Sequence, residues 1–508
     1  MSQVNQHKAG ILLSYVNLLL GCVVPIIYTP IMLNILGKAE YGVYALSQSV
    51  TSYLNLLNLG LSTAMIRYLA KYRASGDIMG VRRMLGLFLT LFGCAAMLVG
   101  IIGCSLSAMS DRFFAKGLTD GEIQRLQILV VIMTGSVMTA FLNSAFSTVI
   151  VTYERFIFAR VFAIAGTVLT PCVNLVLLYI GKGSVGMAVA ALVLQMLTMA
   201  GNVLYCSRRL NITPCFRKMP VNLLKELVGF CFFTFLATIA DMLYWSTDKV
   251  LIGAVIGSVA VAVYNVGGVF TTIMQNMAHA ISQVFTPRVM MMASKENQSM
   301  EEVSGLLVRV GRVQCYVVCF ILSGFLVFGQ RFIMIWSGEG YEEAFYIALL
   351  TMTPLAVPLI QTVALSTIMA KNKHRFRAVV YTAIAVVNVV TTYIVLPYWG
   401  IIGAAACTAV AFALGNGVIM NIYYHRVIKL DIPGFWKSVL PMIIFTLVIA
   451  GGSWFVMNRL VGTQDLWVFL TGVIIYSLIF WGLHWFISMS QYEKQLILGF
   501  IRKGKTET

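Results

Sequence analysis

Long apolar segments follow one another along almost the whole chain, separated by short polar connections. A transmembrane helix needs about 20 predominantly apolar residues, and these segments are of that length. We therefore predict an all-α polytopic membrane protein with about 14 transmembrane helices. The expected spans are 10–35, 41–66, 84–108, 127–151, 157–180, 185–207, 226–256, 262–287, 305–329, 344–370, 377–397, 401–424, 438–457 and 466–488.

The composition agrees with a membrane bundle. The chain has 508 residues, of which 59% are hydrophobic and 11% are charged, whereas soluble domains are about 25% charged. The apolar run 9–36 exceeds the core of a signal peptide, so we expect a retained first helix. The ten cysteines lie scattered in apolar runs without C-x-x-C spacing, which indicates small buried hydrophobes.

Lys and Arg alternate strongly between successive connections. Of the 36 basic residues, 28 fall at the two ends of the chain and in the connections after every second span. Basic residues stay on the cytoplasmic side of short loops, so both termini are expected to be cytoplasmic. The net charge of +17 thus reflects topology and not a nucleic-acid surface. The basic stretch KNKHRFRA (371–378) is expected to be a cytoplasmic loop that touches anionic lipid.

The chain contains an internal repeat. LGKAEYGVY (36–44) and IGSVAVAVY (256–264) align at an offset of 220 residues, and further landmarks follow in the same order with small slips. The matched pairs are Gly37 with Gly257, Tyr44 with Tyr264, Arg155 with Arg375, Asn174 with Asn388 and Gly186 with Gly403. Chance similarity between apolar helices is the alternative, but ordered landmarks favour a true repeat.

The repeat predicts two pseudo-symmetric six-helix lobes, 1–220 and 221–430. The remaining segment, 431–508, is expected to hold two extra transmembrane helices and a cytoplasmic amphipathic tail. Six crossings return the chain to its starting side, so both lobes share one orientation and a pseudo-two-fold axis along the membrane normal. Such repeats are typical of transporters, in which one lobe rocks against the other to give alternating access.

Two stretches carry a family resemblance. LGKAEYGVYALSQSVTSYLNLLNLGLSTAMIRYLAKY (36–72) resembles the N-terminal signature of the polysaccharide biosynthesis and export family. TDKVLIGAVIG (247–257) is similar to the Asp-x-x-x-Ile-Gly segment of that family. The family comprises flippases for O-antigen, capsule and exopolysaccharide repeat units, within the multidrug/oligosaccharidyl-lipid/polysaccharide superfamily.

The resemblance implies a specific function. Two lobes would enclose a central cavity that opens alternately to the two sides of a bacterial cytoplasmic membrane. The cargo would be an undecaprenyl-pyrophosphate-linked oligosaccharide whose lipid tail stays in the bilayer. The partners would be this lipid-linked glycan, membrane lipids and other polysaccharide-assembly proteins, with no nucleic acid.

Polar stripes recur in repeat-equivalent spans and are candidates for the cavity lining. Helical spacing places positions 52, 55, 59 and 62 of span 2 on one face, and the equivalent positions of span 8 on its copy. A polar stripe that faced lipid would lack partners. The alternative is that these residues form hydrogen bonds between helices. The candidates are Ser52, Asn55 and Ser62 in span 2, and Thr272, Gln275, His279 and Ser282 in span 8.

Span 7 carries two acids on one face. Asp241, Trp245 and Asp248 fall at i, i+4 and i+7. An acid at mid-membrane costs about 2.5–3.5 kcal/mol on insertion scales, so Asp241 is expected to face a wet cavity or a partner and is a candidate for ion or proton coupling. Asp248 is expected nearer the outer surface, within reach of water, and Trp245 would stack on a sugar ring. Asp248 is also a coupling candidate, unless it pairs with Lys249 or caps a helix.

Arg67 and Arg288, 221 residues apart, follow spans 2 and 8. Their guanidinium groups suit a pyrophosphate, since each donates paired hydrogen bonds; the alternative is ordinary positive-inside anchoring.

The sequence shows no catalytic motif, metal-ligand cluster or P-loop, so we expect a non-enzyme without a cofactor, other than a transmembrane ion gradient. A small-cation or drug antiporter of the same superfamily is the alternative that Asp241 and Asp248 favour. A membrane glycan polymerase or transferase is the third candidate. Such enzymes tend to need a sizeable external loop, and the longest external loop expected in this chain, 109–126, is too short to form a domain.

Overall fold

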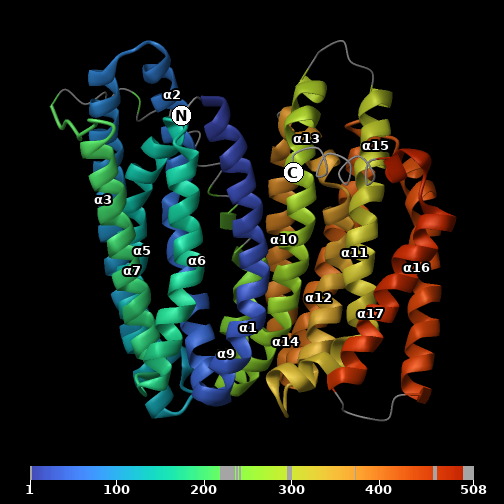
Figure 1. Cartoon of the computed structure of the whole chain (residues 1–508). Coiled ribbons are helices and arrows are strands. Elements are labelled where there is room, and N and C mark those ends of the chain that lie inside the picture. The colour runs from blue at the N-terminus through green and yellow to red at the C-terminus, as the bar shows by residue number, and fades with distance from the viewer. Residues whose placement is uncertain are drawn as a thin grey trace. The chain divides into compact units, whose positions relative to one another are not determined.

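The computed structural model describes residues 3–217, 223, 235, 238–239, 242–294, 300–371, 373–460 and 466–495. All regular secondary structure within these ranges is helical (Figure 1). The prediction of an all-α protein is therefore confirmed for the described part of the chain.

The described helices follow the predicted spans in part, and the span predicted at 41–66 is divided. They are α1 (Gln3–Ser52), the 3₁₀ turn η1 (Tyr53–Asn58), α2 (Leu61–Ala74), α3 (Ile78–Ala108), α4 (Ser110–Phe114), α5 (Asp120–Thr152), α6 (Phe156–Tyr179), α7 (Gly183–Arg208), α9 (Thr247–Val255), α10 (Ser258–Ser294), α11 (Met300–Ser337), α12 (Glu343–Ile360), α13 (Thr362–Ala370), α14 (His374–Phe412), the π-helical turn η3 (Ala413–Ile419), α15 (Met420–Arg426), α16 (Ile432–Leu460), α17 (Leu466–Leu483) and the π-helical turn η4 (His484–Ser488).

In the described ranges, 11 helical segments are long and apolar enough to cross a membrane. Two of them, Leu13–Ala74 and Arg375–Arg426, have 62 and 52 residues, which is far more than one crossing needs. Each contains a glycine with positive φ that breaks the helix, Gly37 at 73° and Gly400 at 60°. The protein is thus a polytopic α-helical membrane protein. The total of fourteen spans stays a prediction, because most of span 7 lies outside the described residues.

The chain forms two compact units. Unit 1 is Met1–Val266 with Ala378–Thr408, and unit 2 is Gly267–Arg377 with Ala409–Thr508. Helix α10 thus begins in unit 1 and continues in unit 2, whereas α14 begins in unit 2, belongs to unit 1 over 378–408 and ends in unit 2. The predicted lobe boundaries at residues 220 and 430 stay predictions.

The core of unit 1 lies where α3 and α5 pack along each other and α5 packs on α7 (Figure 1). Phe88 and Phe92 of α3 and Phe141 of α5 are almost fully buried there. Gly103 of α3 lies against the side chain of Thr134 on α5, leaving no room for a Cβ. Because lipid tails are as apolar as leucine, such close contact between helices is what holds a membrane bundle together.

The predicted helix over 41–66 is interrupted, which corrects the predicted stripe. After α1 the chain forms the 3₁₀ turn η1, and Leu59 and Gly60 then have φ of 50° and 72°. A left-handed pair cannot continue an α-helix, so positions 52, 55, 59 and 62 do not share one regular helical face. The equivalent region of α10 is unbroken.

Unit 2 contains an ion pair that fixes the C-terminal segment. Arg312 of α11 donates through Nε to Glu493 Oε1 at 2.6 Å and through Nη2 to Oε2 at 3.1 Å. The same guanidinium donates to the carbonyls of Ser438 on α16 and Ser488 in η4. Glu493 also accepts from the backbone N–H of Ser490 at 2.7 Å. The pair therefore joins α11 and α16 to the helical turn at 491–495.

We predict that Glu493→Ala lowers the free energy of unfolding by about 3–5 kcal/mol, because it leaves a half-buried guanidinium without its partner. Burial alone would raise the pKa of Glu493, but hydrogen bonds and charge from Arg312 and the Ser490 N–H outweigh it and the pKa is lowered. This stabilisation is therefore fully present above the ordinary glutamate pKa and is lost as pH falls through the lowered value. Thermal unfolding in detergent across acid pH measures both effects. An unchanged melting temperature for Glu493→Ala at neutral pH would contradict the prediction.

Candidate functional site

Asp248 is the centre of a buried polar network in unit 1. It lies in the first turn of α9 and is 1% exposed, so the expectation that water reaches it is wrong. The hydroxyls of Tyr264 on α10 and Thr408 on α14 donate to Asp248 Oδ2 at 2.6 and 2.7 Å. Asn388 Nδ2 donates to Thr408 Oγ1 at 3.0 Å. One carboxylate thus ties together α9, α10 and α14.

The second carboxylate oxygen of Asp248 is without a hydrogen-bond partner among the described residues. This oxygen, Oδ1, is buried. The next residue, Lys249, directs its Nζ to Asn265 Oδ1 at 2.6 Å, and Asn265 Nδ2 donates to the Tyr41 hydroxyl at 2.6 Å. The hydrogen bond of Lys249 therefore runs to α10.

This arrangement suits reversible binding of a proton or a small cation. A buried carboxylate is unfavourable unless charge or hydrogen bonds compensate it. Two hydroxyl donors satisfy only one oxygen of Asp248, so a proton or cation at Oδ1 would complete the site. Because charges interact strongly in buried surroundings without water, the site with a proton or cation bound at Oδ1 and the site without one would differ strongly in electrostatic energy.

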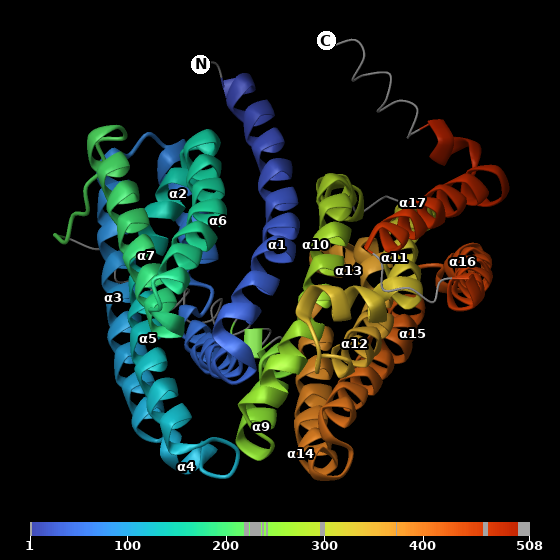
Figure 2. The same ribbon diagram turned by 60° about the horizontal axis from the view of Figure 1, so that its bottom comes forward.

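The two copies of the repeated corner lie against each other in unit 1. Gly42 of the first copy contacts the backbone carbonyl of Ser258 in the second so closely that a Cβ would collide with it. Ser258 Oγ donates to Glu122 Oε1 of α5 at 2.5 Å. Gly117, just after α4, lies against the carbonyl of Gly253 in α9, and Figure 2 shows these two helices side by side. The repeat therefore builds a close contact around α9 and the start of α10.

Ser52 belongs to this contact. Its hydroxyl is 2.9 Å from the Ser246 hydroxyl, and the Tyr53 hydroxyl is 2.5 Å from Thr247 Oγ1. Ser246 and Thr247 immediately precede Asp248, so these bonds hold the start of α9. Ser52 thus joins helices, as the alternative interpretation expected. Asn55 is exposed.

The second predicted stripe lies on an unbroken part of α10 in unit 2. Thr272 and His279 are exposed and Gln275 is half-buried. The Thr272 hydroxyl donates within the helix to the Gly268 carbonyl at 3.0 Å. Their role as cavity lining stays a prediction.

The other candidate residues are only partly described. Trp245 is 37% exposed, one helical turn before Asp248 in the sequence. Arg67 is exposed on α2. Asp241 and the side chain of Arg288 lie outside the described residues, so the coupling role of Asp241 and the basic pair stay predictions.

The sequence analysis missed the partners of Asp248. Tyr264 and Asn388 were identified only as landmarks of the repeat, and Thr408 was not singled out. Lys249 was named only as an alternative pairing partner of Asp248. A polar residue that recurs inside apolar helices was the available signal. Its contact with Asp248 was not visible, because Thr408 lies 160 residues from the acid it binds.

The fold is shared with solved membrane proteins. The structure matches a lipid II flippase, MurJ, in an inward closed conformation with a TM-score of 0.70 and 12% identity, covering 92% of this chain and 98% of that one. It also matches an inward-facing multidrug resistance MATE family transporter of the MOP superfamily with a TM-score of 0.62 and 13% identity, covering 82% and 96% of the two chains. At these identities the likeness shows that this chain shares its fold with both proteins.

The sequence defines the family. The chain belongs to the polysaccharide biosynthesis protein family, whose model matches residues 31–346, more than half of its length. It is 22% identical over 298 residues to the "Probable low-salt glycan biosynthesis flippase Agl15" of Haloferax volcanii, a match that covers 58% of this chain and 61% of that relative. It is 22% identical over 500 residues to the "Uncharacterized membrane protein EpsK" of Bacillus subtilis, with 94% of each chain covered.

The contact between the repeated corners generates a prediction. Gly42→Ala places a methyl group against the Ser258 backbone, so we expect a loss of about 1–3 kcal/mol in the free energy of unfolding from overpacking. Gly21→Ala is the matched control, since it makes the same change in α1 before the break at Gly37 and its Cβ would meet no atom within 4 Å. Thermal unfolding in detergent compares the two variants. Equal melting temperatures would show that the corners are not in close contact.

Proposed function

We propose that this protein is a flippase that moves an undecaprenyl-pyrophosphate-linked oligosaccharide from the inner to the outer leaflet by alternating access. The observation that carries this proposal is the family match over residues 31–346. A relative named as a probable glycan biosynthesis flippase and the fold of a lipid II flippase support it.

The need to carry polar sugars and charged pyrophosphate across hydrocarbon explains the predicted architecture. Sugar hydroxyls and pyrophosphate charges cannot enter hydrocarbon without losing their hydration. Two six-helix lobes with fourteen spans in total would offer them a polar route while the lipid tail stays in the bilayer. In this proposal Arg67 and Arg288 bind the pyrophosphate, Trp245 stacks on a sugar, and Asn55 and the stripe of α10 contact the hydroxyls.

Asp248 is proposed to couple transport to an ion gradient. Binding of a proton or cation at Oδ1 changes the charge at the point where α9, α10 and α14 meet. A ligand shifts a conformational equilibrium only if it binds the two states differently. The Tyr264 and Thr408 hydroxyls come from separate helices, so a relative movement of these helices would alter the affinity of the site. Asp241 remains a second proposed coupling residue.

The location and partners are proposed on the same basis. The protein would lie in a bacterial cytoplasmic membrane with both termini cytoplasmic, and would act with other polysaccharide-assembly proteins. No bond is made or broken in this function, so we propose that it is not an enzyme.

An ion-coupled antiporter of small molecules or drugs is the second candidate. Likeness to the MATE fold and the buried Asp248 favour it. The proposed basic pair favours an anionic cargo instead, because guanidinium groups would repel the cationic drugs that an acidic site selects.

Transport in vesicles separates these functions. We predict that the purified protein, reconstituted with a fluorescent undecaprenyl-pyrophosphate oligosaccharide, moves it across the bilayer in response to a pH or sodium gradient. Asp248→Asn should abolish the response to the gradient, because the neutral amide cannot gain or lose a charge. Arg67→Ala with Arg288→Ala should weaken transport at low cargo concentration and leave the response to the gradient intact.

Asp120→Asn is the matched control, since the same chemical change falls on an exposed acid at the start of α5. A protein that exchanges a cationic dye but leaves the lipid-linked glycan in place would be an antiporter. If Asp248→Asn responds to the gradient as the parent does, coupling lies elsewhere.

A further inference from the structure

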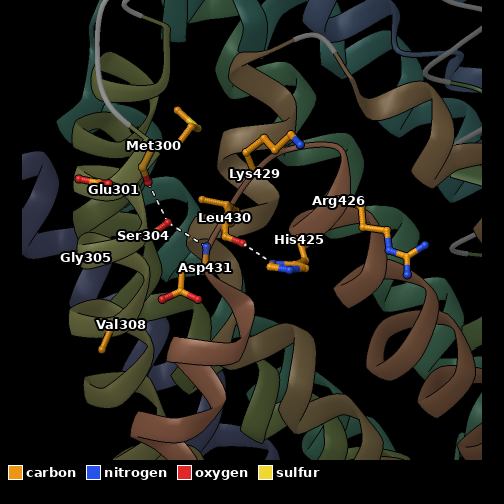
Figure 3. Close-up of a pocket in the computed structure, with 10 residues that line it drawn as sticks. All are labelled: Met300, Glu301, Ser304, Gly305, Val308, His425, Arg426, Lys429, Leu430 and Asp431. Carbon is orange, nitrogen blue, oxygen red and sulfur yellow. Dashed lines mark hydrogen bonds between the residues drawn. The ribbon is translucent and has the colours of Figure 1, made fainter.

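Unit 2 contains a pocket that the proposed transport does not use. It has a volume of about 1070 Å³ and is lined by the first turns of α11 and by the connection between α15 and α16 (Figure 3). Met300, Gly305 and Val308 lie on the α11 side, facing residues 425–431. The pocket is built from two segments more than a hundred residues apart in the sequence.

The pocket lies at the end of three helices that are able to cross the membrane. Segment Met300–Ser337 begins there, Arg375–Arg426 ends there and Ile432–Met457 begins there. Three apolar segments that start or stop together mark the boundary between hydrocarbon and headgroups. The surrounding connections are among the basic ones, so the positive-inside rule puts this boundary on the cytoplasmic side.

The wall formed by the end of α15 and its connection to α16 has a net positive charge, because two basic residues outnumber the one acid, Asp431. Arg426 and Lys429 are exposed there. Lys429 has a φ of 68°, in the left-handed region that a lysine seldom adopts. The adjacent His425 is fixed through Nδ1, 3.2 Å from the Leu430 carbonyl.

Further basic residues adjoin the pocket. Lys371 Nζ lies 3.2 Å from Met300 Sδ, and Lys373 Nζ is 3.5 Å from the carbonyl of Val427. Both belong to the basic stretch 371–378. The cationic surface therefore continues from the pocket into the neighbouring loop.

Two acids also line the pocket. One oxygen of the Asp431 carboxylate accepts from the backbone N–H of Gly434 at 2.9 Å, which caps α16. Glu301 lies on the α11 wall and is exposed. Glu301 therefore opposes the binding of an anion, and this opposition provides a test.

We propose that this pocket binds the phosphate headgroup of an anionic membrane phospholipid. Arg426 and Lys429 would contact the phosphate, and Met300 and Val308 on the α11 wall would contact the adjoining apolar carbons of the lipid. A soluble anion would use the cationic wall but not these apolar side chains. The position at a membrane boundary supplies the lipid at high local concentration, and each Lys or Arg near an anionic surface adds to the attraction.

The test uses the purified full chain in detergent, titrated with phosphatidylglycerol and followed by native mass spectrometry. Arg426→Gln with Lys429→Gln should weaken binding by about tenfold or more, since each basic residue contributes independently. Arg208→Gln with Arg209→Gln makes the same change of charge at exposed residues near the end of α7 and should leave binding unchanged. Glu301→Gln should strengthen binding, a gain that damage to the fold would not produce.

Gly305→Leu separates a shaped pocket from general attraction. No atom lies within 4 Å of the place of a Cβ at Gly305, so a leucine side chain there would project into the pocket and narrow it without altering its charge. We expect binding to be lost while the melting temperature is kept. The proposal would be overturned if Gly305→Leu bound the lipid as well as the parent does. It would also be overturned if the double variants at 426/429 and at 208/209 lost the same amount of lipid binding. Displacement of the lipid by free pyrophosphate at matched concentration would also overturn it, because the site would then accept soluble anions.

Discussion

A carboxylate buried inside a membrane bundle has to be solvated by the protein itself. For Asp248 the hydroxyls of Tyr264 and Thr408 do this at one oxygen, and each comes from a different helix. Hydrogen bonds to a charged group are worth about 1.5–3 kcal/mol each, so these two bonds offset part of the cost of burying the acid where α9, α10 and α14 meet. In the proposed mechanism, a proton or cation bound at the unpartnered oxygen Oδ1 would shift that balance.

The backbone contacts around α9 place this acid. Gly42 against Ser258 and Gly117 against Gly253 bring backbones together at distances that no side chain would allow. The positive φ of both Gly37 and Gly257 lets each copy of the corner turn sharply. The two copies of the repeated sequence therefore contact each other. Ser258 of the second copy also donates a hydrogen bond to Glu122. Movement of α9 would have to break these contacts together, which favours two discrete arrangements over gradual bending.

Much of the fold could be predicted from the sequence, because in lipid the apolar length of a segment and the satisfaction of its backbone leave few alternatives to helices. The glycine corners could be predicted because the same pattern occurs twice. The break at Leu59 could not, since nothing local distinguishes a leucine in a left-handed conformation from one in a helix. The partners of Asp248 were equally hidden, as Thr408 reaches it only through tertiary packing. From the sequence alone Asp248 was expected near water. That expectation used only the depth of Asp248 along one helix, and the neighbouring residues that cover it could not be seen.

A double-mutant cycle between Asp248 and Tyr264 tests the central claim most directly. The free energy of unfolding would be measured for the parent, Asp248→Asn, Tyr264→Phe and the double variant, each purified in the same detergent. If the carboxylate is solvated by this hydroxyl, Tyr264→Phe should destabilise the parent by about 1.5–3 kcal/mol and the Asp248→Asn background by much less. Equal losses in both backgrounds would contradict the account, because the two groups would then contribute independently.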